Sequence, residues 1–429
     1  MNKQTIKCDL LGEEYTVWKH ETGLTILLYP MPGYASSCAM FGTRYGSIDR
    51  MFQSSLDDSY QTVPDGIAHY LEHKLFENEN GDAFSLFAQT GASANAYTSF
   101  ERTAYFFSCT DHFEESLRIL LSFVRSPYFT DETVAKEQGI IGQEIKMYDD
   151  NPGWQVLFQC LKGLYREHPV KIDVAGTVES IGQINKELLY RCYQSFYNLN
   201  NMVLAVAGGF DPEVVMRTVT ELLPYEEPIT IQREQVCEPP EVVQSRVEGF
   251  LPVSMSQFCI GYKMQPLDGL ERLMAETECA ALCELICGEG TELYRSFYET
   301  GLVSGGEIGT EVFAGRGYFS VLFEGESNDP DEVLSRLQQE IARLKQQGLS
   351  KEQVALVKKA LYGRILRSFG TVDDVANSLL SAGLSNISVY APLEMTQKLT
   401  LEGLTARLES FNSERVTLSV ISPTAELEE

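Results

Sequence analysis

The segment His69-Tyr-Leu-Glu-His73 is the most informative stretch of this sequence. At about 100° per residue of an α-helix, His69 and His73 project roughly 40° apart, and Glu72 lies roughly 60° to the other side of His69. All three side chains therefore share one face of a predicted helix, for which Asp65 is the expected N-cap. The opposite face carries apolar residues at intervals of four: Ile67, Leu71 and Leu75.

Two imidazoles with this spacing are typical zinc ligands. Their ring nitrogens can lie about 2.0 to 2.1 Å from one Zn²⁺, and a catalytic zinc needs a third protein ligand and an open position for water. Zinc lowers the pKa of that water toward about 7, so Glu72 can take its proton during attack on a carbonyl and pass it to the leaving amine. The pattern thus indicates peptide hydrolysis. The alternative is two surface histidines beside a solvated Glu, which is disfavoured because the chain has only 5 histidines.

A second predicted helix, beginning at Thr130, offers the third ligand. It carries Glu137 and Glu144, which are seven positions apart and so lie on one face. Seven residues rise about 10.5 Å along a helix, so both carboxylates cannot bind one ion. One should ligate the metal while the other supports the site or its histidines. The pattern alone does not say which.

These residues also resemble a known family. His69-Tyr-Leu-Glu-His73, then Gly91-Ala-Ser-Ala-Asn-Ala-Tyr-Thr-Ser99 and Glu137-Gln-Gly-Ile-Ile-Gly-Gln-Glu144, are similar to the pitrilysin and insulinase family of zinc metallopeptidases with an inverted HxxEH motif. The resemblance is greatest to its short bacterial branch and to the mitochondrial processing peptidase. It implies a zinc metalloendopeptidase that hydrolyses unstructured peptides. It also assigns the roles: His69, His73 and Glu144 as zinc ligands, Glu72 as general base and Glu137 as the supporting carboxylate.

The resemblance further implies how peptide is bound. The strand around Asn95, Ala96 and Tyr97 would lie at a sheet edge beside the metal and pair with the substrate backbone. An edge strand has unpaired N–H and C=O groups, so an extended peptide can add to it with little dependence on its sequence. Phe76, one turn beyond His73, either borders a side-chain pocket or belongs to the core.

The implied fold is α+β, with two homologous domains that face each other across a cleft. Each domain would be an antiparallel-rich sheet with helices packed on one face. The sequence divides accordingly into a zinc-binding catalytic domain (1–226), a Pro- and Glu-rich linker (227–245) and a second domain without metal (246–429). Strands are expected at 16–18, 24–29 and 37–41, and the similar closing strands 202–207 and 416–421 indicate a weak duplication.

One departure from the family concerns the second half. Active members usually carry there an Arg followed six residues later by a Tyr, which hold the substrate carbonyl near the metal. Tyr298 and Ser304 stand at those positions in our alignment. The resemblance therefore favours the zinc-bearing chain of a dimer with a paralogous subunit, with a homodimer as the alternative. A non-catalytic peptide-binding or assembly subunit is the alternative function.

The amino-acid composition limits the classes of partner that we expect. The 429 residues contain 34 Lys plus Arg against 61 Asp plus Glu, a net charge of −27. Such a charge repels phosphate backbones and anionic lipids, so neither nucleic acid nor membrane is an expected partner. We expect a cytoplasmic protein, because the N-terminus lacks a signal-like apolar segment and no 18 apolar residues run together.

The ten cysteines include no CxxC pair, but Cys279, Cys283 and Cys287 lie at intervals of four. Such a stripe is either a metal or redox cluster or, as we favour, a row of buried thiols that pack as small apolar residues.

Overall fold

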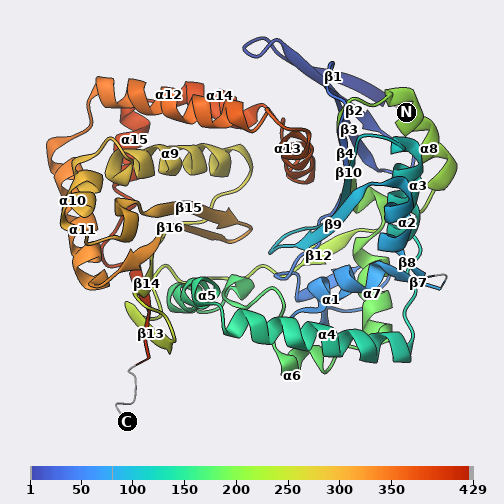
Figure 1. Ribbon diagram of the computed structural model, residues 1–429, viewed down its shortest axis with the longest axis horizontal. Helices are drawn as coiled ribbons and strands as arrows, with labels where there is room; N and C mark the ends of the chain where they lie inside the picture. The colour runs from blue at the N-terminus through green and yellow to red at the C-terminus, as the bar shows by residue number, and fades with distance from the viewer. Residues whose placement is uncertain (1, 80, 425–429) are drawn as a thin grey trace. The chain divides into compact units, whose positions relative to one another are not determined.

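The computed structural model describes residues 2–79 and 81–424, which form two compact units (Figure 1). The first unit combines Met1–Ile145, Asp173–Glu234 and Leu366–Ala391. The second unit combines Lys146–Ile172, Gln235–Ile365 and Pro392–Glu429. Each unit thus includes a segment from the half of the chain that mainly builds the other. The contiguous domains 1–226 and 246–429 stay a prediction. They differ from the two units, because each unit includes a segment from the other half of the chain.

The first unit is built on a seven-stranded sheet in the order β1-β2-β3-β11-β4-β10-β9. Only β3 and β11 run parallel among these neighbours. The strands predicted at 16–18, 24–29, 37–41 and 202–207 are confirmed. The strand bounds are β1 Asn2–Cys8, β2 Glu13–Lys19, β3 Thr25–Pro30, β4 Ser37–Thr43, β9 Ser93–Thr98, β10 Thr103–Cys109 and β11 Met202–Gly208.

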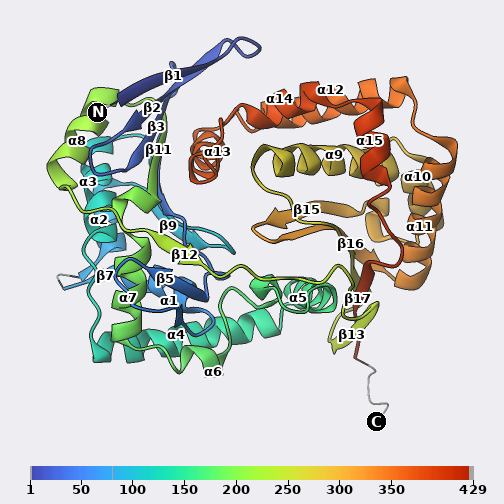
Figure 2. The same cartoon turned by 180° about the vertical axis from the view of Figure 1, so that it is seen from behind.

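Helices cover both faces of this sheet. The side that carries Leu27, Met40 and Ala205 packs against α13 (Val372–Leu384). On the other side lie the helices α1 Ile67–Leu75, α2 Ala83–Thr90, α3 Phe113–Val124, α7 Lys186–Phe196 and α8 Pro212–Leu222 (Figures 1 and 2). Every residue of β11 is buried, which explains its continuous apolar sequence. The helix layer predicted on one face is therefore present, and α13 covers the second face, which the sequence did not predict.

The second unit repeats this connectivity. Its sheet has the order β13-β17-β14-β16-β15, in which only β13 and β17 run parallel. This is the pattern of β3-β11-β4-β10-β9, so the predicted repeat is reproduced in the topology. The strands are β13 Arg246–Leu251, β14 Ser256–Lys263, β15 Gly309–Gly315, β16 Tyr318–Ser327 and β17 Val416–Pro423.

Helix α5 (Pro152–Leu164) covers one face of the second sheet at β13, β14 and β17. The opposite face packs against α9 (Gly269–Cys287) and α11 (Pro330–Gln347). The other helices are α10 Glu292–Thr300, α12 Lys351–Arg367, α14 Ala391–Lys398 and α15 Leu401–Leu408. Cys279, Cys283 and Cys287 lie buried in this core as free thiols, so their interpretation as packing residues is confirmed.

A buried ion pair anchors the chain where it enters the second unit. Lys263 Nζ lies 2.7 Å from Glu238 Oε1, and both side chains are 4% exposed. Glu238 also accepts the backbone N–H groups of Arg166, Glu167 and His168. Burial disfavours the carboxylate, but these hydrogen bonds outweigh it and lower the pKa of Glu238.

The remaining described elements position the site or close the chain. They are β5 Met51–Ser54, β6 Gln61–Thr62, β7 Glu77–Asn78, β8 Gly81–Asp82, α4 Asp131–Asp149, α6 Val178–Ile181 and β12 Ile231–Arg233, with short 3₁₀ turns at Pro169–Lys171, Leu199–Asn201 and Ser304–Gly306. Within the described residues, no helix is both long and apolar enough to cross a membrane.

Candidate metal centre

Helix α1 carries the HxxEH residues as predicted, but it begins differently from the expectation. Asp65 is not the N-cap. Gly66 is, with φ of 85° and no side-chain cap, while Asp65 forms an ion pair with Arg50. A Cβ at Gly66 would lie 2.3 Å from the carbonyl oxygen of Ala175, so a glycine is required for this close approach. The approach holds the start of α1 against the turn near residue 175.

Helix α4 brings a carboxylate to each histidine. Glu144 Oε1 lies 3.7 Å from Nε2 of His69, and Glu144 Oε2 lies 3.4 Å from Nε2 of His73. Glu137 Oε1 lies 3.1 Å from Nδ1 of His73. The ring centroids of the two histidines are 4.6 Å apart. The two glutamates therefore contact different atoms of the pair, as the seven-residue spacing predicted.

The arrangement fits a metal ion. One ligand atom from each of His69, His73 and Glu144 lies within 4.8 Å of the others, and no other such group of three is found in the part of the chain that the structure describes. Edges of about 3.3 Å are expected between ligands of a tetrahedral zinc. Within residues 2–79 and 81–424, the buried Nδ1 of His69 has no hydrogen-bond partner. Because Glu137 accepts from Nδ1 of His73, Nε2 is the nitrogen of that ring that would bind a metal, which must displace its proton.

The protonation of these groups reflects their burial. Burial lowers the pKa of His69 to about 4, with the neighbouring His73 adding to the effect, so its imidazole is neutral at pH 7. Burial opposes the charged form of His73 too, but hydrogen bonds to Glu137 and Glu144 outweigh it and raise the pKa to about 10. Burial raises the pKa of Glu72 to about 7, against the effect of a hydrogen bond from Thr98.

Glu72 lies beside the histidines and is held from the edge strand. It is 8% exposed, and its Oε2 accepts a hydrogen bond of 2.6 Å from the hydroxyl of Thr98 on β9. Thr98 follows the quoted Asn95-Ala96-Tyr97 stretch and had no predicted role. The signal that could have found it is alternation, because Thr98 and Ala96 share one face of a strand.

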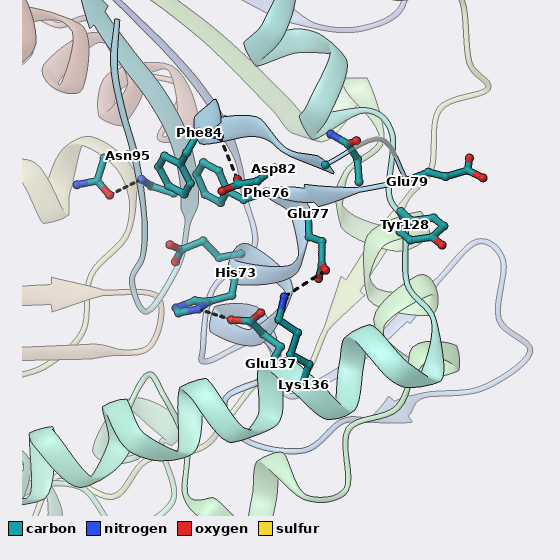
Figure 3. A pocket seen from close by; sticks show the side chains of 14 residues that line it. His73, Phe76, Glu77, Glu79, Asp82, Phe84, Asn95, Tyr128, Lys136 and Glu137 are labelled. Atoms are coloured by element: carbon teal, nitrogen blue, oxygen red, sulfur yellow. Dashed lines mark hydrogen bonds and ion pairs between the residues drawn. The ribbon is translucent and has the colours of Figure 1, made fainter. Parts of the chain in front are cut away.

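A pocket of about 720 Å³ opens next to the histidines (Figure 3). Glu72, His73 and Glu137 line one end of it, and Phe76 forms a wall. The ring of Phe76 stacks on that of Phe84, with centroids 4.3 Å apart. Phe76 is thus both 7% exposed and a pocket residue, so the two alternatives for it are compatible. Charged groups at the rim are Glu77, Glu79, Asp82 and Lys136.

The edge strand β9 divides its side chains between the two faces of the sheet. It pairs only with β10, from Ser93 to Thr98, so its other edge is unpaired within the described residues. Asn95 and Ala96 line the pocket, and Asn95 Oδ1 accepts from the N–H of Ala96. Tyr97 does not line it. Its hydroxyl donates to Asn377 of α13 at 2.9 Å, on the opposite face.

Sequence reasoning also missed Lys74. Its side chain is fully buried directly after His73, and its ammonium donates to Glu77 at the pocket rim. Tyr298 lies 67% exposed on α10, and Ser304 begins the 3₁₀ turn that follows. Both lie in the second unit, and their alignment to the family's Arg and Tyr stays a prediction.

Known proteins were compared with the whole chain. Residues 59–178 match the family described as Insulinase (Peptidase family M16), and residues 183–361 match the one described as Peptidase M16 inactive domain. A Bacillus subtilis (strain 168) protein named Uncharacterized zinc protease YmfH is 38% identical over 424 residues, which cover 97% of this chain and 99% of that protein.

Solved structures of peptidases also resemble this chain. An M16-like peptidase from Alicyclobacillus acidocaldarius superposes with a TM-score of 0.93 and 34% identity, over 98% of this chain and 100% of that chain. A protease from Helicobacter pylori gives a TM-score of 0.82 over 95% of this chain and 99% of that chain, and at 16% identity it shows the shared fold alone. The profile matches and the close relatives agree with the resemblance drawn from the HxxEH segment, and the chain therefore belongs to peptidase family M16, the insulinase family.

Proposed function

We propose that the chain is a zinc-dependent endopeptidase that hydrolyses extended, unstructured peptides. The observation that carries the proposal is the convergence of His69, His73 and Glu144 beside the carboxylate of Glu72. Relatives named zinc proteases support the metal. A zinc ion held by these three residues would supply Lewis acidity, which polarises a carbonyl oxygen and acidifies water.

The protein's own groups have separate tasks in this proposal. Glu137 holds Nδ1 of His73 and so directs Nε2 toward the metal position. Glu72 takes the proton of the attacking water and returns it to the leaving amine. Burial raises the pKa of Glu72 above its ordinary value, which makes the carboxylate a stronger base.

The unpaired edge of β9 is the proposed docking line for the peptide. An added strand would pair its main chain with the backbone around Asn95 and Ala96, next to the pocket walled by Phe76. Tyr97 would contribute through its backbone, since its side chain is directed to α13. Main-chain pairing explains how varied sequences could be accepted.

We further propose that the active form is a dimer with a paralogous subunit, or with a second copy of this chain. Tyr298 and Ser304 support this, because neither can replace the guanidinium that the resemblance leads us to expect at the substrate carbonyl. Losing one such donor costs about 10² to 10³ in rate. The same substitution favours the second candidate, a non-catalytic peptide-binding or assembly subunit.

The test is mass spectrometry of a mixed pool of unstructured peptides incubated with the zinc-loaded chain or with its Glu72→Gln variant. Zinc content is measured on both. Cleavage by the wild type alone, with equal zinc in both, is the expected result. Equal cleavage by the two proteins would refute the role of Glu72. Zinc-loaded wild type that cleaves nothing, alone or with a purified paralogue, would favour the non-catalytic subunit.

A further inference from the structure

Thr98 connects the edge strand to the carboxylate of Glu72. Its hydroxyl donates to Glu72 Oε2 at 2.6 Å, the shortest link between β9 and α1 that involves the HxxEH segment in the described structure. The neighbouring Tyr97 is tied to the opposite face through Asn377. The last two residues of β9 are thus hydrogen-bonded on both faces of the sheet.

The neighbouring hydroxyls determine which group donates a hydrogen bond to Glu72. Thr103 Oγ1 lies 3.3 Å from Thr98 Oγ1 and donates to the carbonyl oxygen of Tyr45 at 3.0 Å. A hydroxyl has one proton to donate, and an ionised carboxylate only accepts. Since the proton of Thr103 is committed to Tyr45, the proton of Thr98 is available for Glu72.

Burial makes this hydrogen bond matter. Glu72 is 8% exposed and Thr103 is fully buried, so water reaches the carboxylate only from the pocket that Glu72 lines. A hydrogen bond to a charged group in such surroundings is stronger and more directional than one in water. Without it, the carboxylate keeps several rotamers within reach of the same space.

We propose that Thr98 is a positioning residue, which fixes the carboxylate of Glu72 relative to the docking strand. The inference rests on the proposed function, in which peptide pairs with β9 and Glu72 moves the proton. Because one residue belongs to the strand and touches the base, a peptide paired with β9 is placed in register with the base. A misplacement of about 1 Å can cost about 100-fold in rate.

The decisive variants are Thr98→Val, which removes the hydroxyl and keeps the shape, and Thr98→Ser, which keeps the hydroxyl. We expect kcat to fall about 10- to 100-fold in Thr98→Val with KM and zinc content unchanged. Thr98→Ser should retain most of kcat. KM is spared because the main chain of β9, which would pair with peptide, is unaltered.

Thr43→Val is the matched control. Thr43 pairs with Thr103 in the same row of the sheet, and its hydroxyl donates to the carbonyl oxygen of Phe196 at 2.6 Å. This variant should lower the melting temperature without changing kcat. If Thr98→Val and Thr43→Val lower stability equally and leave kcat equal to the wild type, Thr98 has a structural role only and the proposal is wrong.

A second readout does not depend on activity. Crystal structures of the wild type, Thr98→Val and Thr98→Ser would show the position of the Glu72 carboxylate. We expect it to move in Thr98→Val and to stay in Thr98→Ser. An unmoved carboxylate in Thr98→Val would overturn the proposal even if the chain cleaves peptides. A displaced carboxylate would support it even if the wild type proved inactive, in which case only the proposed function fails.

Discussion

Helices α1 and α9 hold the same place in the two units, and they use it differently. Along the chain, α1 lies between β4 and the hairpin β9–β10, and α9 lies between the equivalent strand β14 and the hairpin β15–β16. Each hairpin begins with an edge strand. Each carries a pair of possible metal ligands at i and i+4, His69 and His73 in α1, Cys279 and Cys283 in α9. The histidines meet Glu144, whereas the thiols are buried among apolar side chains.

The difference teaches that ligand spacing is not sufficient for a metal site. In the first unit, α4 adds carboxylates to the face that the histidines share. In the second unit, the thiols of α9 point into the core, where burial raises the pKa of Cys279 to about 12. A thiol that stays protonated is a poor ligand. Two ligands at i and i+4 can therefore form a metal site only if a second element places a charged side chain against them.

The largest expected effect comes from breaking the first of these sites. His69→Ala and Glu144→Gln should each weaken zinc binding by more than about 100-fold, since even residues that only support ligands account for about 10- to 100-fold. Zinc content after dialysis against a chelator measures this. Cys283→Ala is the control and should keep its zinc. Full zinc in His69→Ala would mean that the metal lies elsewhere.

The second unit has its own buried charges, and removing one should cost stability without affecting metal. Glu238→Gln leaves the ammonium of Lys263 without its carboxylate. Breaking a buried ion pair in this way costs about 3 to 5 kcal/mol. Urea unfolding at pH 7 checks the loss, and zinc content should equal that of the wild type. Lys263 Nζ also donates to the carbonyl oxygens of Leu164 and Glu241, and a loss below about 1 kcal/mol would show that these two acceptors suffice.

The same pair predicts a pH dependence. The folded pKa of Glu238 is lower than its unfolded value of 4.5, so its stabilising contribution is present above pH 4.5 and is lost as pH falls through the lowered pKa. The wild type should therefore lose more free energy of unfolding between pH 5 and acid pH than Glu238→Gln. Parallel curves for the two proteins would contradict this assignment.

A smaller effect distinguishes the two glutamates of α4. Glu137→Gln should lower zinc affinity about 10- to 100-fold, because the amide no longer holds Nδ1 of His73 as an ionic acceptor. Competition with a chromophoric chelator measures the change. If Glu137→Gln loses all zinc while Glu144→Gln keeps it, the assignment of ligand and supporting residue is reversed.

The sequence predicted that these side chains lie together, because their positions follow helix geometry. Two helices with periodic apolar faces required His69, His73 and Glu72 on one surface, and the seven-residue spacing of Glu137 and Glu144 required different partners for each. The strands at 16–18, 24–29, 37–41, 202–207 and 416–421 were visible as apolar runs, and the similar closing strands indicated the repeat. The strands β1, β10 and β13 were not predicted. Local periodicity is sufficient for predictions of this kind.

What the sequence did not show depends on contacts between distant segments. The start of α1 at Gly66 follows from the approach of Ala175, more than a hundred residues away. Helix α13 packs against the first sheet, so residues near 380 contact residues near 27. The periodicity of α13 does not show which sheet it packs against. The Thr98 hydroxyl reaches Glu72 only because β9 lies beside α1. Side-chain pairs of this kind are set by topology, which one sequence does not reveal.

The smallest predicted effect tests the packing interpretation of α9. Cys279 is fully buried, and its thiol contacts the sulfur of Met264 at 3.7 Å. Cys279→Ser replaces sulfur by a hydroxyl whose burial without a good acceptor costs about 1 to 3 kcal/mol. A serine in a helix can donate to the carbonyl four residues earlier, so we expect about 1 kcal/mol. The midpoint of urea unfolding measures this loss of stability, and the zinc content should equal that of the wild type.

Cys279→Ala separates packing from polarity in that experiment. Alanine removes the sulfur but buries no polar group, so it should be no less stable than the serine variant if the thiol serves as a small apolar residue. A serine variant more stable than the alanine variant would instead reveal a polar partner for position 279. In that case α9, like α1, would have a polar partner for a residue of its i and i+4 pair. The two helices would then differ only in that α1 carries histidines.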